Sequence, residues 1–105
     1  MEERLKVGDI VKHFKRETLG QPMNLYLYKI IAIAEHTESK ERFVIYQALY
    51  ENAAMGVHFG IYARPYNMFM SEVDHEKYPD VKQKYRMEKI NENNIHTHER
   101  MMNNV

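Results

Sequence analysis

The sequence predicts a small, mainly β domain: an SH3-like curved sheet or partly open barrel of four to five strands with one short C-terminal helix. Apolar residues between positions 25 and 70 repeat with a period nearer two than 3.6, which is typical of strands. The same stretch holds six of the eight tyrosines, and aromatic residues fit a pleated surface well. Short polar segments separate the apolar runs, as expected for short strands joined by tight turns.

The 105 residues are enough for one domain, which we expect over residues 1–88, followed by a flexible polar tail over 89–105. Cysteine is absent, which excludes a disulfide scaffold, a thiol nucleophile and cysteine-based metal sites. The formal net charge is zero, so binding to nucleic acid would need a local basic patch. No apolar run resembles an export signal or a membrane span. We therefore expect a cytoplasmic protein with no membrane partner.

Strands are predicted where the sequence alternates or stays apolar. These strands cover residues 9–15, 25–36, 43–50 and 57–64. Polar segments rich in turn formers connect them, at residues 16–24, 37–42 and 51–56. The strand over 25–36 is almost continuously apolar, which favours a central or strongly curved position.

The alternation of the fourth strand predicts which of its side chains are buried. Its core face would consist of Val57, Phe59, Ile61 and Ala63. The opposite face would then carry His58, Tyr62 and Arg64. Ile33 and Ile45 are also expected in the core. Pro65 cannot donate to a β-ladder, so it should end the strand or place it at an edge.

The C-terminal part is predicted to contain a helix. Residues 66–73 are expected to begin with a turn and to finish as a short fifth strand. Pro79 suits the first position of a helix that runs to about Met87. Tyr78, Val81 and Tyr85 recur at helical spacing. Residues 85–90 could alternate as a strand instead, and the sequence leaves both open.

The tail carries two histidines, His96 and His98, next to Glu99. Imidazole and carboxylate groups can bind metal ions. Residues two apart on a helix face different directions, however, and a flexible tail loses entropy when it is ordered around a metal. We predict that the tail binds no metal.

Five segments carry a resemblance to a known family: VGDIVKHFK, YKIIAIAEHTES, VIYQALY, ARPYNMFMSEVDHEKYP and KQKYR. Together they resemble the bacterial family of small proteins described as domain of unknown function 1653, from about Lys6 to Glu88. The resemblance implies a compact, β-rich, cytoplasmic bacterial protein. It implies no activity, cofactor or catalytic residue.

Few residues are suited to catalysis. Ser39 and Ser71 lie in polar turns and outside any nucleophile-elbow motif. The glycines are too far apart in the sequence to form a phosphate-binding loop. We therefore predict no catalytic residue and no cofactor.

A ligand-binding face is the strongest functional prediction. The candidate residues are His13, His36, Tyr46, Gln47, Tyr62 and Arg64. Tyrosine, arginine and histidine side chains in one row suit a flat or anionic ligand, such as a base, a phosphate or a peptide carboxylate. The alternative is ordinary pairing of side chains on a sheet surface.

Arg64 precedes Pro65, which holds it in extended backbone at a strand end. It could present its guanidinium to a ligand, or it could pair with Glu72 or Asp74 within the protein.

We expect a non-enzymatic binding module for a peptide or a short nucleic acid. One alternative is a small-metabolite sensor or an enzyme, with His36 or His13 as the proton carrier and Arg64 as the anion clamp. Another is an obligate protein-interaction subunit, with a homo-oligomer as one option, in which the apolar strand over 25–36 pairs with another chain through its edge.

Overall fold

The structure is a computed structural model and describes residues 4–20 and 24–90. Its elements are β1 (Ile10–His13), α1 (Lys15–Thr18), β2 (Leu27–Glu35), β3 (Arg42–Ala48), β4 (Glu51–Asn52), the 3-10 helix η1 (Ala53–Met55), β5 (Val57–His58), β6 (Ile61–Pro65), α2 (Tyr66–Phe69) and β7 (Met87–Lys89). None of the helices in these ranges has the length and apolarity needed to cross a membrane.

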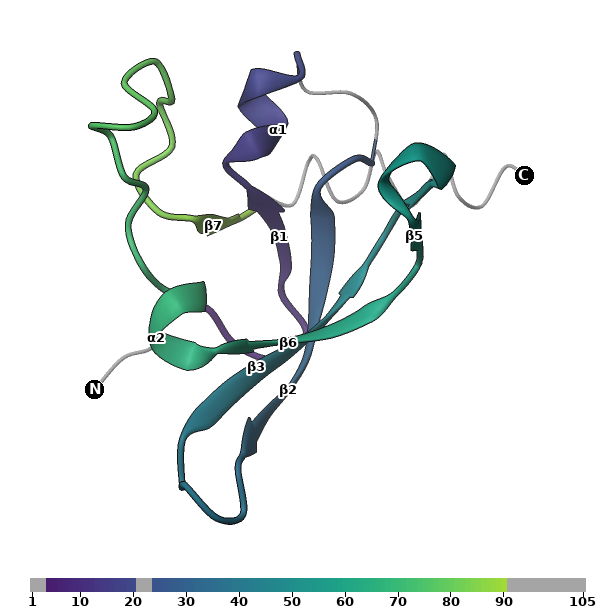
Figure 1. Cartoon of the computed structure of the whole chain (residues 1–105), viewed down its shortest axis with the longest axis vertical. Coiled ribbons are helices and arrows are strands. Elements are labelled where there is room, and N and C mark those ends of the chain that lie inside the picture. Colours follow the sequence, from purple (N-terminus) through teal and green to yellow (C-terminus); the bar gives the residue numbers. More distant parts are fainter. Residues whose placement is uncertain (1–3, 21–23, 91–105) are drawn as a thin grey trace.

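Five strands form one antiparallel sheet in the order β6-β3-β2-β1-β7, and β4 pairs with β5 in a small ribbon (Figure 1). The prediction of a mainly β, partly open fold is confirmed, because β6 and β7 lie at opposite edges of the sheet and do not pair. Central placement of the apolar second strand is also confirmed. β2 lies between β1 and β3.

The β2–β3 hairpin is the longest pairing in the sheet and extends from Tyr28 opposite Ala48 to Glu35 opposite Arg42. The polar segment before Arg42 forms the predicted turn. A register shift between Ile30 and Ala32 marks a bulge. Because the bulge changes the alternation of β2, Ile30 and Ile33 both lie opposite inner-face residues of β3.

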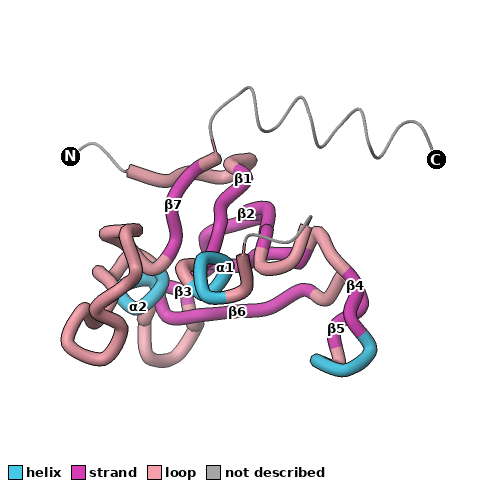
Figure 2. Tube along the Cα trace, turned by 90° about the horizontal axis from the view of Figure 1, so that it is seen from above, coloured by secondary structure: helices cyan, strands magenta, loops and turns pink. Residues whose placement is uncertain are grey.

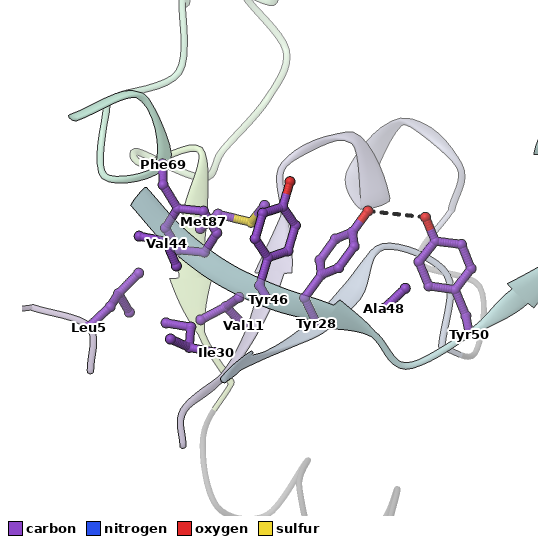
Figure 3. Close-up of a cluster of buried hydrophobic side chains, with 10 residues drawn as sticks. All are labelled: Leu5, Val11, Tyr28, Ile30, Val44, Tyr46, Ala48, Tyr50, Phe69 and Met87. Carbon is purple, nitrogen blue, oxygen red and sulfur yellow. Dashed lines mark hydrogen bonds between the residues drawn. The ribbon is translucent and has the colours of Figure 1, made fainter. Parts of the chain in front are cut away.

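The main core lies on one face of the sheet, which we call the inner face (Figure 3). Its buried members are Leu5, Val11, Tyr28, Ile30, Val44, Tyr46, Ala48, Tyr50, Phe69 and Met87. Three of these are tyrosines, whose hydroxyls need polar partners when they are buried. Tyr28 and Tyr50 satisfy each other through a hydroxyl–hydroxyl hydrogen bond of 3.0 Å.

The predicted phase of the fourth strand is wrong. The run breaks at Phe59, whose φ of 48° separates β5 from β6. Phe59 is 45% exposed and Ile61 is 63% exposed, whereas Tyr62 lies opposite Tyr46 on the inner face. The alternation predicts the wrong core face because the apolar residues of β6 lie on the outer face of the sheet, which no described element covers.

The other predicted core positions are partly buried. Val57 packs on the edge of the core, and Ile33 and Ile45 are half-buried. Ala63, on the outer face of β6, is exposed.

The predicted C-terminal helix is not formed. Residues 79–86 are irregular, and the strand alternative for residues 85–90 is confirmed by β7. The fifth strand expected within 66–73 is replaced by α2 and an isolated bridge between Glu72 and Tyr85. A helical turn, α1, replaces the start of the loop expected over 16–24.

Helical spacing was outweighed here because carboxylate side chains bind the backbone N–H groups of this segment. Glu88 Oε2 accepts from the N–H groups of Lys84 and Tyr85, at 2.9 Å each. Ile90, just after β7, is buried and donates its N–H to the Ile10 carbonyl. The rest of the predicted tail, including His96 and His98, lies outside the described residues.

Replacing Phe69 by alanine should lower the free energy of unfolding by about 3–5 kcal/mol, because Phe69 is fully buried against Tyr46 and its loss leaves a cavity. Phe59→Ala is the matched control. It removes the same ring from an exposed position, so urea unfolding should show a much smaller loss. A larger loss in the Phe59 variant would contradict the observed phase of β6.

Candidate anion-binding site

A concavity of about 360 Å³ opens between the end of β1, strand β6 and the loop that connects α2 to β7. Its lining residues are His13, Phe14, Lys15, Arg64, Asp74, Lys77, Tyr78 and Arg86. Figure 2 shows this loop on the side of the molecule away from β4 and β5. We call this hollow the basic concavity, because four of its side chains are lysine or arginine and one is a carboxylate.

The loop is held in place by Glu17 and Gln83. The Glu17 carboxylate in α1 accepts the N–H groups of Lys82 and Gln83, at 2.9 and 2.8 Å. The buried amide Nε2 of Gln83 donates to three carbonyl oxygens, those of Lys12, Tyr85 and Arg86. These bonds connect the loop to β1 and α1. They therefore also fix the position of the Arg86 backbone.

Phe14 and Tyr78 form an apolar wall of the basic concavity. Their rings meet edge to face at 4.9 Å. With Val73 and Val81 they form a second, smaller core. The loop is therefore anchored by packing as well as by hydrogen bonds.

Arg64 and Arg86 bring two guanidinium groups to the same hollow. Among the described residues, Arg64 makes no hydrogen bond and no ion pair, although it is only half-exposed. Arg86 Nε donates to Ser71 Oγ at 3.2 Å. Burial, followed by repulsion from Arg64, lowers the pKa of Arg86 below its ordinary value. Both cations lack a carboxylate partner in the described structure, so a bound anion would stabilise them.

The acids that could have neutralised Arg64 are engaged elsewhere. Asp74 Oδ1 accepts the backbone N–H groups of Glu76 and Lys77. Glu72 pairs with Lys84 at 3.9 Å on the surface. The alternative in which Arg64 pairs with Glu72 or Asp74 is therefore wrong.

His13 lies at the inner end of the concavity and is 6% exposed. Its Nδ1 accepts the N–H of Lys15 at 3.1 Å, and its ring stacks on Phe14. Burial, with the charges of Arg64, Arg86 and Lys15, lowers its pKa to about 3. The ring is therefore neutral at neutral pH, with its proton on Nε2. A histidine so hard to protonate is poorly matched to general base catalysis near pH 7.

Tyr46 and Tyr62 lie on the inner face but do not line the basic concavity. Tyr46 is 5% exposed and belongs to the core. The Tyr62 ring lies 5.8 Å from that of Tyr46, on edge strand β6, and is 37% exposed. Tyr62 and Arg64 thus share one face of β6, as predicted, but this is the inner face. His58, which was expected beside them, lies in β5 and contacts Glu51.

Two predicted site residues lie elsewhere. Gln47 is opposite Ile61, and its Nε2 donates to the Phe59 carbonyl at 3.1 Å. His36 begins the β2–β3 turn, where its Nδ1 accepts the N–H groups of Glu38 and Ser39 at 3.2 Å each. His36 therefore shapes a turn and does not line the basic concavity.

Sequence reasoning missed six of the eight lining residues of the basic concavity. The missed residues are Phe14, Lys15, Asp74, Lys77, Tyr78 and Arg86. The only available signal was the density of lysine and arginine after Asp74, and the predicted helix would have spread these side chains around its surface. No group of three metal-ligating residues occurs within residues 4–20 and 24–90.

Comparison with known proteins gives one match. The family model described as "Protein of unknown function (DUF1653)" matches residues 9–99. No curated protein and no solved structure matches the chain.

The buried neutral His13 should make the protein less stable in mild acid. Below pH 6.5 the unfolded chain takes up a proton at this residue, whereas the folded chain does so only near pH 3, so stability falls as the pH drops through this window. The free energy of unfolding, measured with urea, should fall between pH 7 and pH 4.5 by about 2 kcal/mol less in His13→Asn than in the wild type. An unchanged loss in the variant would show that folded His13 takes up its proton in mild acid.

Proposed function

The chain belongs to the DUF1653 family, and we propose that it is a non-enzymatic module that binds a phosphate-bearing ligand in the basic concavity. The observation that carries the proposal is Arg64. Its guanidinium is half-buried beside Arg86 and lacks any anionic partner in the described part of the chain. An arginine without a carboxylate at such a position is most simply explained by an anion that arrives with the ligand.

The charge of the concavity favours phosphate over a single carboxylate. Lys15, Arg64, Lys77 and Arg86 line it, whereas Asp74 is its single acid. A phosphate group offers three acceptor oxygens and up to two negative charges, so it compensates more of this charge than a carboxylate does. Guanidinium groups also bind phosphate oxygens bidentately.

The rigidity of Arg64 supports binding as well. It lies in the ordered ladder of β6 opposite Val44, and Pro65 restricts its backbone to extended geometry. A side chain on such a fixed backbone loses less conformational freedom when it binds a ligand.

The alternatives receive less support. The enzyme hypothesis needs a proton carrier, but His13 has a very low pKa and His36 lies in a hairpin turn. The interaction-subunit hypothesis depended on a free edge of the apolar second strand, but β2 pairs on both sides. A sensor of a small phosphorylated metabolite would use the same cations and is the second candidate.

Inorganic pyrophosphate should bind the wild-type protein in calorimetric titration at low salt. Arg64→Gln and Arg86→Gln should each weaken binding about tenfold or more, which corresponds to the roughly 1.5–3 kcal/mol of a hydrogen bond to a charged group. Arg64→Lys should weaken it too, because lysine cannot form the bidentate contact.

Lys29→Gln is the matched control, because Lys29 is an exposed cation on the outer side of β2. It should bind pyrophosphate like the wild type. Equal loss of affinity in the Lys29 variant, or none in the arginine variants, would refute the proposed site.

A further inference from the structure

We propose that the ligand is single-stranded nucleic acid and that Tyr62 is the platform on which one of its bases stacks. This inference rests on the proposed function, since it takes the phosphate site for granted. It goes further by naming the ligand class and the residue that contacts the base.

Tyr62 differs from the other tyrosines of the inner face. Tyr28, Tyr46 and Tyr50 are each at most 7% exposed, whereas Tyr62 is 37% exposed. The Tyr62 hydroxyl also makes no hydrogen bond with a described residue, whereas Tyr28 and Tyr50 bond to each other. Tyr46 lies against one side of the ring, and 37% of Tyr62 remains accessible to solvent.

Gly60 explains how the ring is held. A Cβ at Gly60 would lie 2.5 Å from the Tyr62 hydroxyl oxygen and 2.8 Å from Cζ. The phenol ring therefore lies back over the backbone of Gly60, in space that any other residue would fill. Gly60 and Tyr46 thus fix the position of the ring, and a base would stack on the part of it that stays exposed.

Tyr62 and Arg64 are neighbours along the inner face of β6. They are two positions apart and point to the same face, so their Cα atoms are about 6.5–7 Å apart. The Tyr62 ring lies towards Gly60, so a strand whose phosphate is bound by Arg64 would have to run along β6 to bring a base to the ring. Single-stranded nucleic acid is commonly bound by this pairing of cations that follow the backbone with aromatic rings that stack bases.

A peptide fits these features less well. The concavity has four cations and one acid, so a peptide ligand would need several acidic or phosphorylated residues. Nucleic acid carries one negative charge per nucleotide and always offers a planar base next to it. The exposed ring beside the unpaired guanidinium therefore favours nucleic acid.

The test compares two fluorescent oligomers of about ten units by anisotropy with the full chain at fixed low salt: oligothymidylate and an abasic oligomer with the same phosphates. The wild type should bind oligothymidylate at least about fivefold more tightly, because stacking adds to the phosphate contacts. Tyr62→Ala should bring the ratio of the two affinities, oligothymidylate over abasic oligomer, close to one. Tyr62→Phe should retain the wild-type ratio.

Gly60→Ala tests the same idea without removing the ring, because its new Cβ must displace the Tyr62 phenol. This variant should also lower the ratio. Phe59→Ala is the matched control, since Phe59 is an exposed aromatic that precedes β6 and does not share the strand with Arg64, and it should leave the ratio unchanged.

Equal affinity of the wild type for both oligomers would overturn the stacking role of Tyr62 and leave the phosphate site standing. Binding of pyrophosphate, or of an acidic peptide such as oligoglutamate, without binding of either oligomer would overturn nucleic acid as the ligand. Failure to bind pyrophosphate would instead contradict the proposed function itself.

Discussion

The loop between α2 and β7 has almost no regular secondary structure, and Glu17 and Gln83 hold it in place. Glu17 accepts two consecutive N–H groups of the loop, and Gln83 donates to carbonyl groups in β1 and next to β7. The buried positions of this loop, such as Val81 and Gln83, need such partners, because unpaired backbone groups are costly to remove from water. The position of Arg86 depends on these bonds, and so does the wall that Tyr78 forms with Phe14.

The inner face imposes a second constraint. The five-stranded sheet is open, with β6 and β7 at its edges, and three tyrosine rings belong to the core on its inner face. Tyr28 and Tyr50 satisfy each other's hydroxyls. At the edge of the sheet, Tyr62 packs against Tyr46 and Arg64 continues the same face without an anionic partner among the described residues. The proposed binding site thus continues the face on which the core packs.

The sequence predicts the parts of this arrangement that depend on local pattern. It correctly predicts the mainly β class, the central second strand and the hairpin turn, and it places Tyr62 and Arg64 together. It assigns the wrong phase to β6, because Ile61 and Ala63 are apolar yet lie on the outer face. It also predicts a helix where long-range bonds to Glu17 hold the chain. Arg86 joins the site through those bonds, so local spacing could not reveal it.

The central claim is that Arg64 and Arg86 together form one anion site. The most direct test is NMR of the arginine Nε–Hε groups in nitrogen-15-labelled protein during titration with pyrophosphate. The account predicts that the signals of Arg64 and Arg86 shift together, in a saturable manner and with one common affinity. Saturable shifts at other arginines, with these two signals unmoved, would contradict it.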